Sequence, residues 1–148
     1  MYEGNQVYWE NEAELKAKVA AVKENLRNSP TLMRDAVLIV EKQVKENASG
    51  RPGPNVGTGR LRASIKGEVL TPNLGRVGTA LQPHYAPDVE YGHSQTPGRF
   101  VAAIGKRLVK DSCPAYPFFQ PAVEQVKPQL EGVVMVNFGK TLENIWRA

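Results

Sequence analysis

Cysteine and histidine are nearly absent from the sequence, which has one cysteine and two histidines among 148 residues. A single thiol, Cys113, cannot form an intramolecular disulfide, and with His84 and His93 it supplies too few soft ligands for a structural zinc site. Cys113 stands between Ser112 and Pro114 and lacks a recognised nucleophile signature. We therefore expect it to be a small apolar filler and not the nucleophile of a Cys-His hydrolase.

Known metal-binding and phosphate-binding patterns are also missing. His84 stands four residues before Asp88 and six before Glu90, a spacing that fits neither a helical His pair nor a known carboxylate set. Residues 57–60 read Gly-Thr-Gly-Arg, but the Gly-Lys-Ser/Thr of a phosphate-binding loop is absent. We expect no cofactor, no metal and no enzymatic activity.

No apolar run approaches the ~20 residues that cross a bilayer. The first residues, Met1–Asn5, lack the basic stretch and apolar core of a signal peptide. Apolar residues make up 41% and charged residues 23% of the chain, both ordinary values for a globular protein. We expect one soluble domain over residues 1–148, made in a cytoplasm and without a membrane partner.

The net charge of +4 comes from the middle of the chain. Residues 48–112 carry nine basic and four acidic side chains, whereas residues 1–47 carry seven and eight and residues 113–148 carry three of each. This excess is more typical of a solvated face, and it is also compatible with a surface that meets phosphates or an acidic partner protein. The basic residues of interest form two groups, the first being Arg51, Arg60, Arg62 and Lys66 and the second Arg99, Lys106, Arg107 and Lys110.

Residues 10–47 are predicted to form a pair of amphipathic helices. Apolar residues recur at spacings of three and four on both sides of a break at residues 28–30. Ser29 can cap the second helix, and Pro30 suits its first position because a proline has no N–H to leave unsatisfied there. Two helices joined by so short a link are expected to pack as an antiparallel hairpin or to lie together on a sheet.

Residues 48–58 are predicted to be a mobile loop, because residues 48–59 contain four glycines and two prolines in twelve positions. Residues 60–112 are expected to contain the sheet. The expected elements are a helical turn at 60–64, a hairpin of strands 65–70 and 76–81, a turn-like or one-turn helical element at 85–92, and a second strand pair at 100–104 and 107–110.

Residues 114–146 are predicted to contain one long C-terminal helix. Pro128 is expected to kink it or to split off a short first piece, because proline removes a backbone hydrogen bond and clashes with the preceding turn. The fold class is therefore α+β, with an N-terminal amphipathic helix pair, a central antiparallel sheet of about four strands and a long kinked C-terminal helix.

Three short motifs occur between residues 58 and 122. They read Thr-Gly-Arg-Leu-Arg-Ala-Ser-Ile at residues 58–65, Tyr-Ala-x-x-Val-Glu-Tyr-Gly at 85–92 and Tyr-Pro-Phe-Phe-x-Pro-Ala at 116–122. Their candidate functional residues are Thr58, Gly59, Leu61, Arg62, Ser64, Ile65, Tyr85, Ala86, Glu90, Gly92, Pro117, Phe118, Pro121 and Ala122.

Each motif also has a physical interpretation of its own. Gly59 frees the backbone for a turn that Thr58 can cap, while Leu61 and Ile65 seat the turn on the core and the two arginines face outward. Tyr85 and Val89 are expected to anchor the second motif beside a turn. Glu90 is then available to pair with a cation such as Arg62. Phe118 and Phe119 are expected to anchor the start of the last helix.

In this order, the motifs resemble the tail-completion, or head–tail joining, neck proteins of long-tailed bacteriophages. The pattern of that family runs roughly Thr-Gly-x-Leu-x-x-Ser-Ile, Tyr-Ala-x-x-x-Glu-x-Gly and Arg-Pro-Phe-x-x-Pro-Ala, and the resemblance covers about residues 10–146. The chain departs from it at Tyr116, where the family has arginine, and in the connector of residues 93–113.

The resemblance implies a structural protein of the virion neck, assembled in the host cytoplasm. Copies would form a ring, with a hexamer favoured, between the head connector or stopper protein and the tail terminator protein. DNA would pass through the lumen without sequence-specific contacts. Two alternatives stay open: a tail terminator ring that caps the tail tube, and a small basic nucleic-acid-binding protein that uses the central Arg and Lys groups.

Overall fold

The computed structural model describes residues 12–50, 53–54, 59–80, 84–102 and 105–147. The elements are, in chain order, α1 (Glu12–Arg27), α2 (Pro30–Asn47), α3 (Arg60–Ser64), β1 (Ile65–Thr71), β2 (Leu74–Thr79), α4 (Ala86–Tyr91), β3 (His93–Ser94), β4 (Phe100–Val101), β5 (Lys106–Arg107), β6 (Ser112–Cys113) and α5 (Phe119–Arg147). The coarse prediction of N-terminal helices, antiparallel strands and a long C-terminal helix is confirmed.

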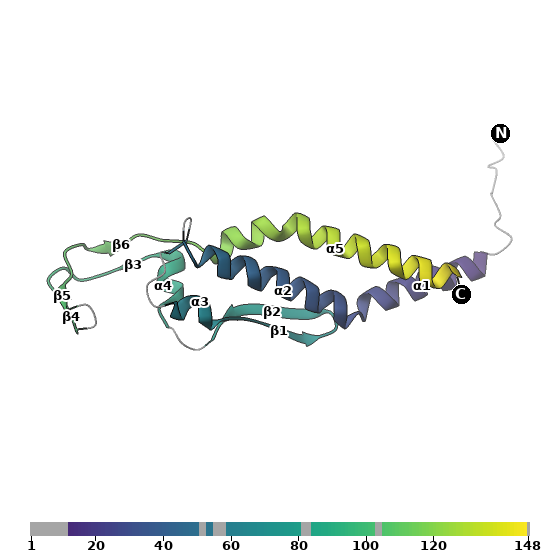
Figure 1. Cartoon of the computed structure of the whole chain (residues 1–148), viewed down its shortest axis with the longest axis horizontal. Coiled ribbons are helices and arrows are strands. Elements are labelled where there is room, and N and C mark those ends of the chain that lie inside the picture. Colours follow the sequence, from purple (N-terminus) through teal and green to yellow (C-terminus); the bar gives the residue numbers. More distant parts are fainter. Residues whose placement is uncertain (1–11, 51–52, 55–58, 81–83, 103–104, 148) are drawn as a thin grey trace, which may run out of the picture.

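The body has three layers, with α2 in the middle (Figure 1). The β1–β2 hairpin packs on one side of α2, and α5 runs antiparallel to it on the other side. With 29 residues, α5 is roughly 43 Å long, so it extends beyond α2 and also contacts α1. The Nζ atom of Lys18 lies 5.7 Å from the ring centroid of Trp146 at this α1–α5 contact.

The expected pairing of the first two helices is wrong. Rather than folding back as a hairpin, α1 and α2 follow one another along α5 (Figure 1). The break itself is as predicted, because Pro30 opens α2 and the Ser29 hydroxyl accepts a hydrogen bond from the Leu32 N–H at 3.3 Å. On α2 the stripe residue Val37 faces the β1–β2 hairpin, and on α1 Leu15 and Val19 are 40% and 55% exposed, so neither stripe is buried by the other helix.

The expected central sheet of about four strands is also wrong. The described strands form three separate antiparallel pairs, β1–β2, β3–β6 and β4–β5. The β1–β2 hairpin agrees with its predicted position and lies on α2, whereas the other two pairs project from the end of the body (Figure 1). A four-stranded sheet would need the two regions side by side, and they are not.

The hairpin lies close to α2 because two glycines face that helix. A Cβ atom on Gly67 would come within 2.3 Å of Val37 Cγ1, and one on Gly75 within 2.4 Å of Val37 Cγ2. The Gly67 N–H also donates to Glu41 Oε2 at 2.8 Å, which fixes the height of β1 on the helix. Side chains at these two glycine positions would push the layers apart.

Helix α5 is not split at Pro128, contrary to one of the two outcomes predicted for that residue. The helix runs from Phe119 to Arg147, and its ribbon is bowed in Figure 1. Pro128 and Glu124, whose carbonyl loses its helical partner there, are both exposed. Water can therefore bond that carbonyl, and the helix tolerates the proline.

Candidate functional site

The three sequence motifs meet in one buried cluster at the end of the body where α5 begins. Leu61 and Ile65 come from the first motif, Ala86 from the second, and Phe118 and Ala122 from the third; each is at most 8% exposed. The cluster is completed by Val44 and Ala48 at the end of α2, with partly buried Val40, Val77, Val89 and Phe119 around it.

The first motif behaves as predicted over its described part. Gly59 has φ +72°, a left-handed conformation that favours glycine, and from it the chain enters α3. Ser64 is buried, and its hydroxyl donates to the Leu61 carbonyl at 2.7 Å. Arg60 and Arg62 are exposed. Thr58 lies outside the described residues.

Glu90, in the second motif, caps the first turn of α5. Its Oε2 accepts hydrogen bonds from the N–H groups of Phe118 at 2.8 Å and Phe119 at 3.0 Å, and its Oε1 accepts one from Gln120 at 2.9 Å. The side chain is 8% exposed. These backbone groups have no partner within the helix, and a carboxylate also suits the positive end of the helix dipole.

The expected ion pair between Glu90 and Arg62 is therefore wrong. Both Glu90 oxygens are already used by backbone N–H groups of α5, and Arg62 is exposed on α3. A buried carboxylate that accepts three backbone hydrogen bonds needs no cation beside it to be satisfied. Glu90 connects the second motif to the third.

The other end of the second motif sets the direction of the chain as it leaves the body. Gly92 has φ +73°, and a Cβ atom there would lie 2.8 Å from the Cys113 carbonyl oxygen and 2.9 Å from the Ala115 nitrogen. Nearby, the Tyr116 N–H donates to the Val89 carbonyl at 2.8 Å. Tyr85 is 43% exposed, so the predicted aromatic anchor of this motif is wrong, and Ala86 is the buried residue.

The third motif starts α5. The rings of Phe118 and Phe119 meet edge to face, with centroids 6.5 Å apart and an interplanar angle of 76°. Phe118 is 2% exposed, as a core anchor should be. Pro117 and Pro121 are half-buried beside it. The backbone of this motif is fixed by Glu90, and its side chains are fixed by the buried cluster.

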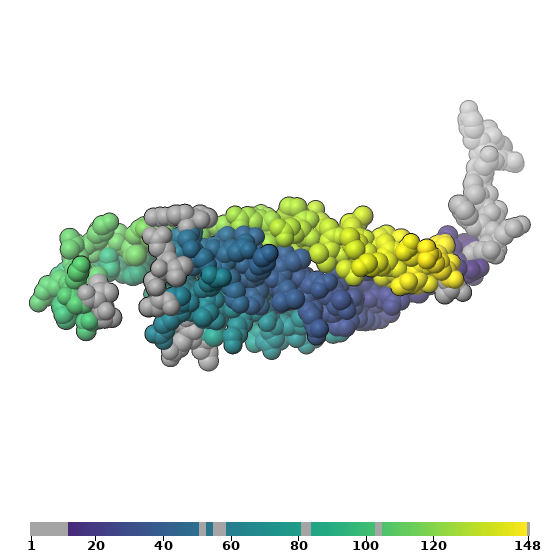
Figure 2. All heavy atoms as spheres, in the orientation of Figure 1, coloured from purple at the N-terminus to yellow at the C-terminus, as the bar shows by residue number. Residues whose placement is uncertain are grey.

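In the connector that departs from the family pattern, the described residues 93–102 and 105–113 form a projecting two-stranded arm (Figures 1 and 2). Its strands pair at the base, where His93 faces Cys113, and near the tip, where Phe100 faces Arg107. The Gln95 N–H donates to the Asp111 carbonyl at 2.7 Å and the Gly98 N–H to the Leu108 carbonyl at 2.8 Å, joining the two pairs into one ribbon.

The two basic groups lie on different parts of the protein. Arg60, Arg62 and Lys66 are exposed on α3 and β1, and Arg51 lies outside the described residues. The second group is the exposed set Arg99, Lys106, Arg107 and Lys110, all on the arm. Within the described residues, the two groups therefore belong to different elements of the chain.

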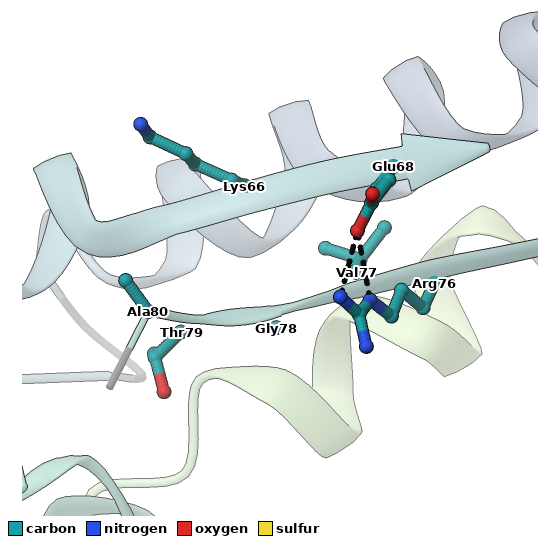
Figure 3. A pocket seen from close by; sticks show the side chains of 7 residues that line it. All are labelled: Lys66, Glu68, Arg76, Val77, Gly78, Thr79 and Ala80. Atoms are coloured by element: carbon teal, nitrogen blue, oxygen red, sulfur yellow. Dashed lines mark hydrogen bonds and ion pairs between the residues drawn. The ribbon is translucent and has the colours of Figure 1, made fainter. Parts of the chain in front are cut away.

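An open depression of 690 Å³ lies along the hairpin (Figure 3). Across it, Arg76 Nε and Nη2 donate to Glu68 Oε2 at 3.0 and 2.7 Å. Both side chains are more than half exposed, so this ion pair contributes at most about 1 kcal/mol. The lining residues are Lys66, Glu68, Arg76, Val77, Gly78, Thr79 and Ala80, and they contain no nucleophile beside a base.

Cys113 and His93 are cross-strand partners, although they stand 20 positions apart in the sequence. Within the described residues no hydrogen bond joins their side chains, and no third group orients the imidazole. His84 is exposed before α4. In that same part of the chain, no three His, Cys, Asp or Glu side chains are grouped to hold a metal ion. None of the described helices is long and apolar enough to cross a membrane.

Comparison with protein-family models, curated proteins and solved structures finds no match to this chain.

Proposed function

We propose that this protein is a structural component of a bacteriophage neck, where copies form a ring that joins the DNA-filled head to the tail. Its neighbours would be the head connector or stopper protein on one side and the tail terminator protein on the other. It acts by interface complementarity and not by bond chemistry.

The observation that carries the proposal is the convergence of the three motifs. They are separated by about 20 to 25 residues in the sequence, yet their apolar residues share one buried cluster and Glu90 connects two of them. Chance matches to common tripeptides have no reason to meet in space. The motifs of a family signature are expected to meet, because the members of a family keep the residues that build their fold.

The exposed apolar side chains also favour an assembly role. Val19 on α1 and Met135, Val136 and Trp146 on α5 are 48–67% exposed in the single chain. Together with the projecting arm, they give one chain several different surfaces. A ring needs two different, matching surfaces on each copy, because its interfaces are heterologous.

Deleting the gene from the phage that encodes it tests the proposal. Electron microscopy of the lysate should show DNA-filled heads and tails of normal length that are not joined. Complementation with the wild-type gene should restore joined particles. Complementation with Phe118→Ala, which removes a buried anchor, should restore fewer, because its core is weakened by roughly 3–5 kcal/mol.

The alternatives give different lysates. A tail terminator caps the tube, so its loss should give tails of irregular length. Infectious particles of normal appearance would contradict both the neck and the terminator hypotheses.

A further inference from the structure

We propose that the arm, residues 93–113, is a duplex-DNA-binding element that lies in the major groove and contacts phosphates on both sides. The inference does not rest on the neck proposal, since it needs only the arm of the purified chain. We assign the DNA contact to the basic residues of the arm and not to Arg60, Arg62 and Lys66 on α3 and β1.

The arm carries an excess of positive charge. The arm carries Arg99, Lys106, Arg107 and Lys110 against one acidic residue, Asp111. Among the described residues, these four cations take part in no ion pair. Four of the five lysines of α1 and α2 differ from them, because each lies beside a glutamate one helical turn away. The arm therefore keeps its positive charge available to an anionic partner.

These charges are distributed over both faces of the ribbon. Residues that face one another across two strands share a face, and successive residues alternate between faces. Phe100 and Arg107 are therefore on one face, and Val101 and Lys106 on the other. By the same alternation, Arg99 lies on the Lys106 face. Both faces of the ribbon carry cations.

A protein partner would meet one face of the ribbon, with an apolar centre and a polar rim. A groove in DNA is different, because it is walled by phosphates on both sides. The major groove of B-DNA is about 12 Å wide and admits a two-stranded β-ribbon. Cations on both faces of a narrow ribbon suit the groove and do not suit a flat acidic protein surface.

The exposed apolar side chains on the arm are compatible with this position. Phe100 is 55% and Val109 is 89% exposed. In the major groove, apolar side chains contact thymine methyl groups. Arg107 Nη1 donates to the Gly98 carbonyl at 2.7 Å, which holds the guanidinium beside the Phe100 face. The side chains of the other three cations have no hydrogen bond within the described residues.

The test is binding of the purified chain to a short mixed-sequence DNA duplex, followed by fluorescence anisotropy from about 50 to about 200 mM salt. If the four cations meet phosphates, log K should fall with log salt at a slope of roughly 3 to 4. The triple variant Arg99→Ala, Lys106→Ala, Lys110→Ala should bind at least tenfold more weakly, and its slope should fall by about 3.

The matched control is the triple variant Arg60→Ala, Arg62→Ala, Lys66→Ala. It removes the same number of positive charges from exposed positions on the body, so the net charge of both variants is equal. Its binding should change less than twofold. Equal losses in the two variants would overturn the proposal, because only net charge would then matter. No binding by the wild-type chain at low salt would also overturn it.

A competition experiment uses polyglutamate of matched charge as the competitor. Duplex DNA should compete at least tenfold better than polyglutamate. Equal competition would contradict the groove proposal and favour an acidic protein as the partner. Circular dichroism of both variants should match the wild type, because all six substituted residues are exposed.

Discussion

Single side chains decide how the motif cluster is held together, and Glu90 has the largest part. It is the one charged residue among the buried polar residues of the described chain, where Asn47 and Ser64 are the others. Because its three bonds come from backbone N–H groups, any residue other than proline can stand at the donor positions, but only a side chain with two acceptor oxygens can replace Glu90 itself. This constraint gives the glutamate of the second motif a structural role, which is to cap α5.

Replacing Glu90 tests this role. Glu90→Ala should lower the free energy of unfolding by about 2–3 kcal/mol, because three N–H groups at the start of α5 lose a charged acceptor. Glu90→Gln should cost less, since one oxygen remains. Urea unfolding followed by circular dichroism measures both. Asp88→Ala, an exposed carboxylate on the same helix, is the control and should stay within about 0.5 kcal/mol of wild type. An equal effect of the two alanine variants would exclude the capping role.

Glu41 makes stability depend on pH. The hydrogen bond from Lys45 is the largest cause that lowers the pKa of the Glu41 carboxyl below its usual 4.5, and the Gly67 N–H adds to it, while burial opposes both. The folded protein therefore binds this proton less readily than the unfolded chain. The contribution is complete above about pH 4.5 and is lost as the pH falls through the lower, folded value.

Urea unfolding from about pH 6 to about pH 3 should show this loss for the wild type. Glu41→Gln should be less stable at pH 6 and should approach the wild type at the acid end. Glu46→Gln on the same helix is the matched control, because Glu46 is more than half exposed and its Lys42 partner is 4.0 Å away. If Glu46→Gln flattens the profile as much as Glu41→Gln, the assignment to Glu41 is wrong.

At the scale of the elements, the β1–β2 hairpin packs closely against α2, with Gly67 and Gly75 next to Val37. Gly67→Ala should cost about 1–3 kcal/mol, because the new methyl group would overlap Val37 and approach Glu41. Adding Val37→Ala should recover part of this loss in a double-mutant cycle. Gly78→Ala is the control on the partner strand and should be neutral or slightly stabilising, since nothing lies within 4 Å of its Cβ position. Additive effects of Gly67→Ala and Val37→Ala would contradict the contact.

We expect the body to fold without the arm. None of the buried core residues of the described chain lies between residues 93 and 113. Replacing these residues by a short Gly-Asn link should leave the urea midpoint nearly unchanged, because Gly92 and Ala115 are already close at its base. The shortened chain should lose DNA binding. Loss of cooperative unfolding would instead mean that the arm is part of the body.

At the scale of the whole molecule, the elongated form and the exposed apolar residues predict assembly. The purified chain should self-associate weakly in solution and form a closed ring in the particle, with a hexamer favoured, because each interface joins two different surfaces. Light scattering over a concentration series and a reconstruction of the neck measure these two states. A single copy in the neck, or an isologous dimer there, would contradict the ring.

The amino-acid sequence by itself determined the features that depend on neighbours along the chain. The start of α2 at Pro30, the β1–β2 hairpin, the short helices α3 and α4 and the long α5 follow from spacing, capping and turn residues, which act within a few positions. It also indicated the buried residues Leu61, Ile65 and Phe118. The predicted loop at residues 48–58 lies partly outside the described residues, but Ala48 and Gly53 are buried in the body.

Only the tertiary structure decided which distant surfaces meet. Amphipathic stripes predict one apolar face on α1 and one on α2, but not that α5 is long enough to contact both helices, so their end-to-end arrangement was not predictable. Strand pairing in the arm depends on residues up to 20 positions apart. The capping role of Glu90 could not be predicted from the sequence, because its partners are backbone N–H groups 28 to 30 residues away. Every residue other than proline carries such a group, so no sequence pattern marks the partners.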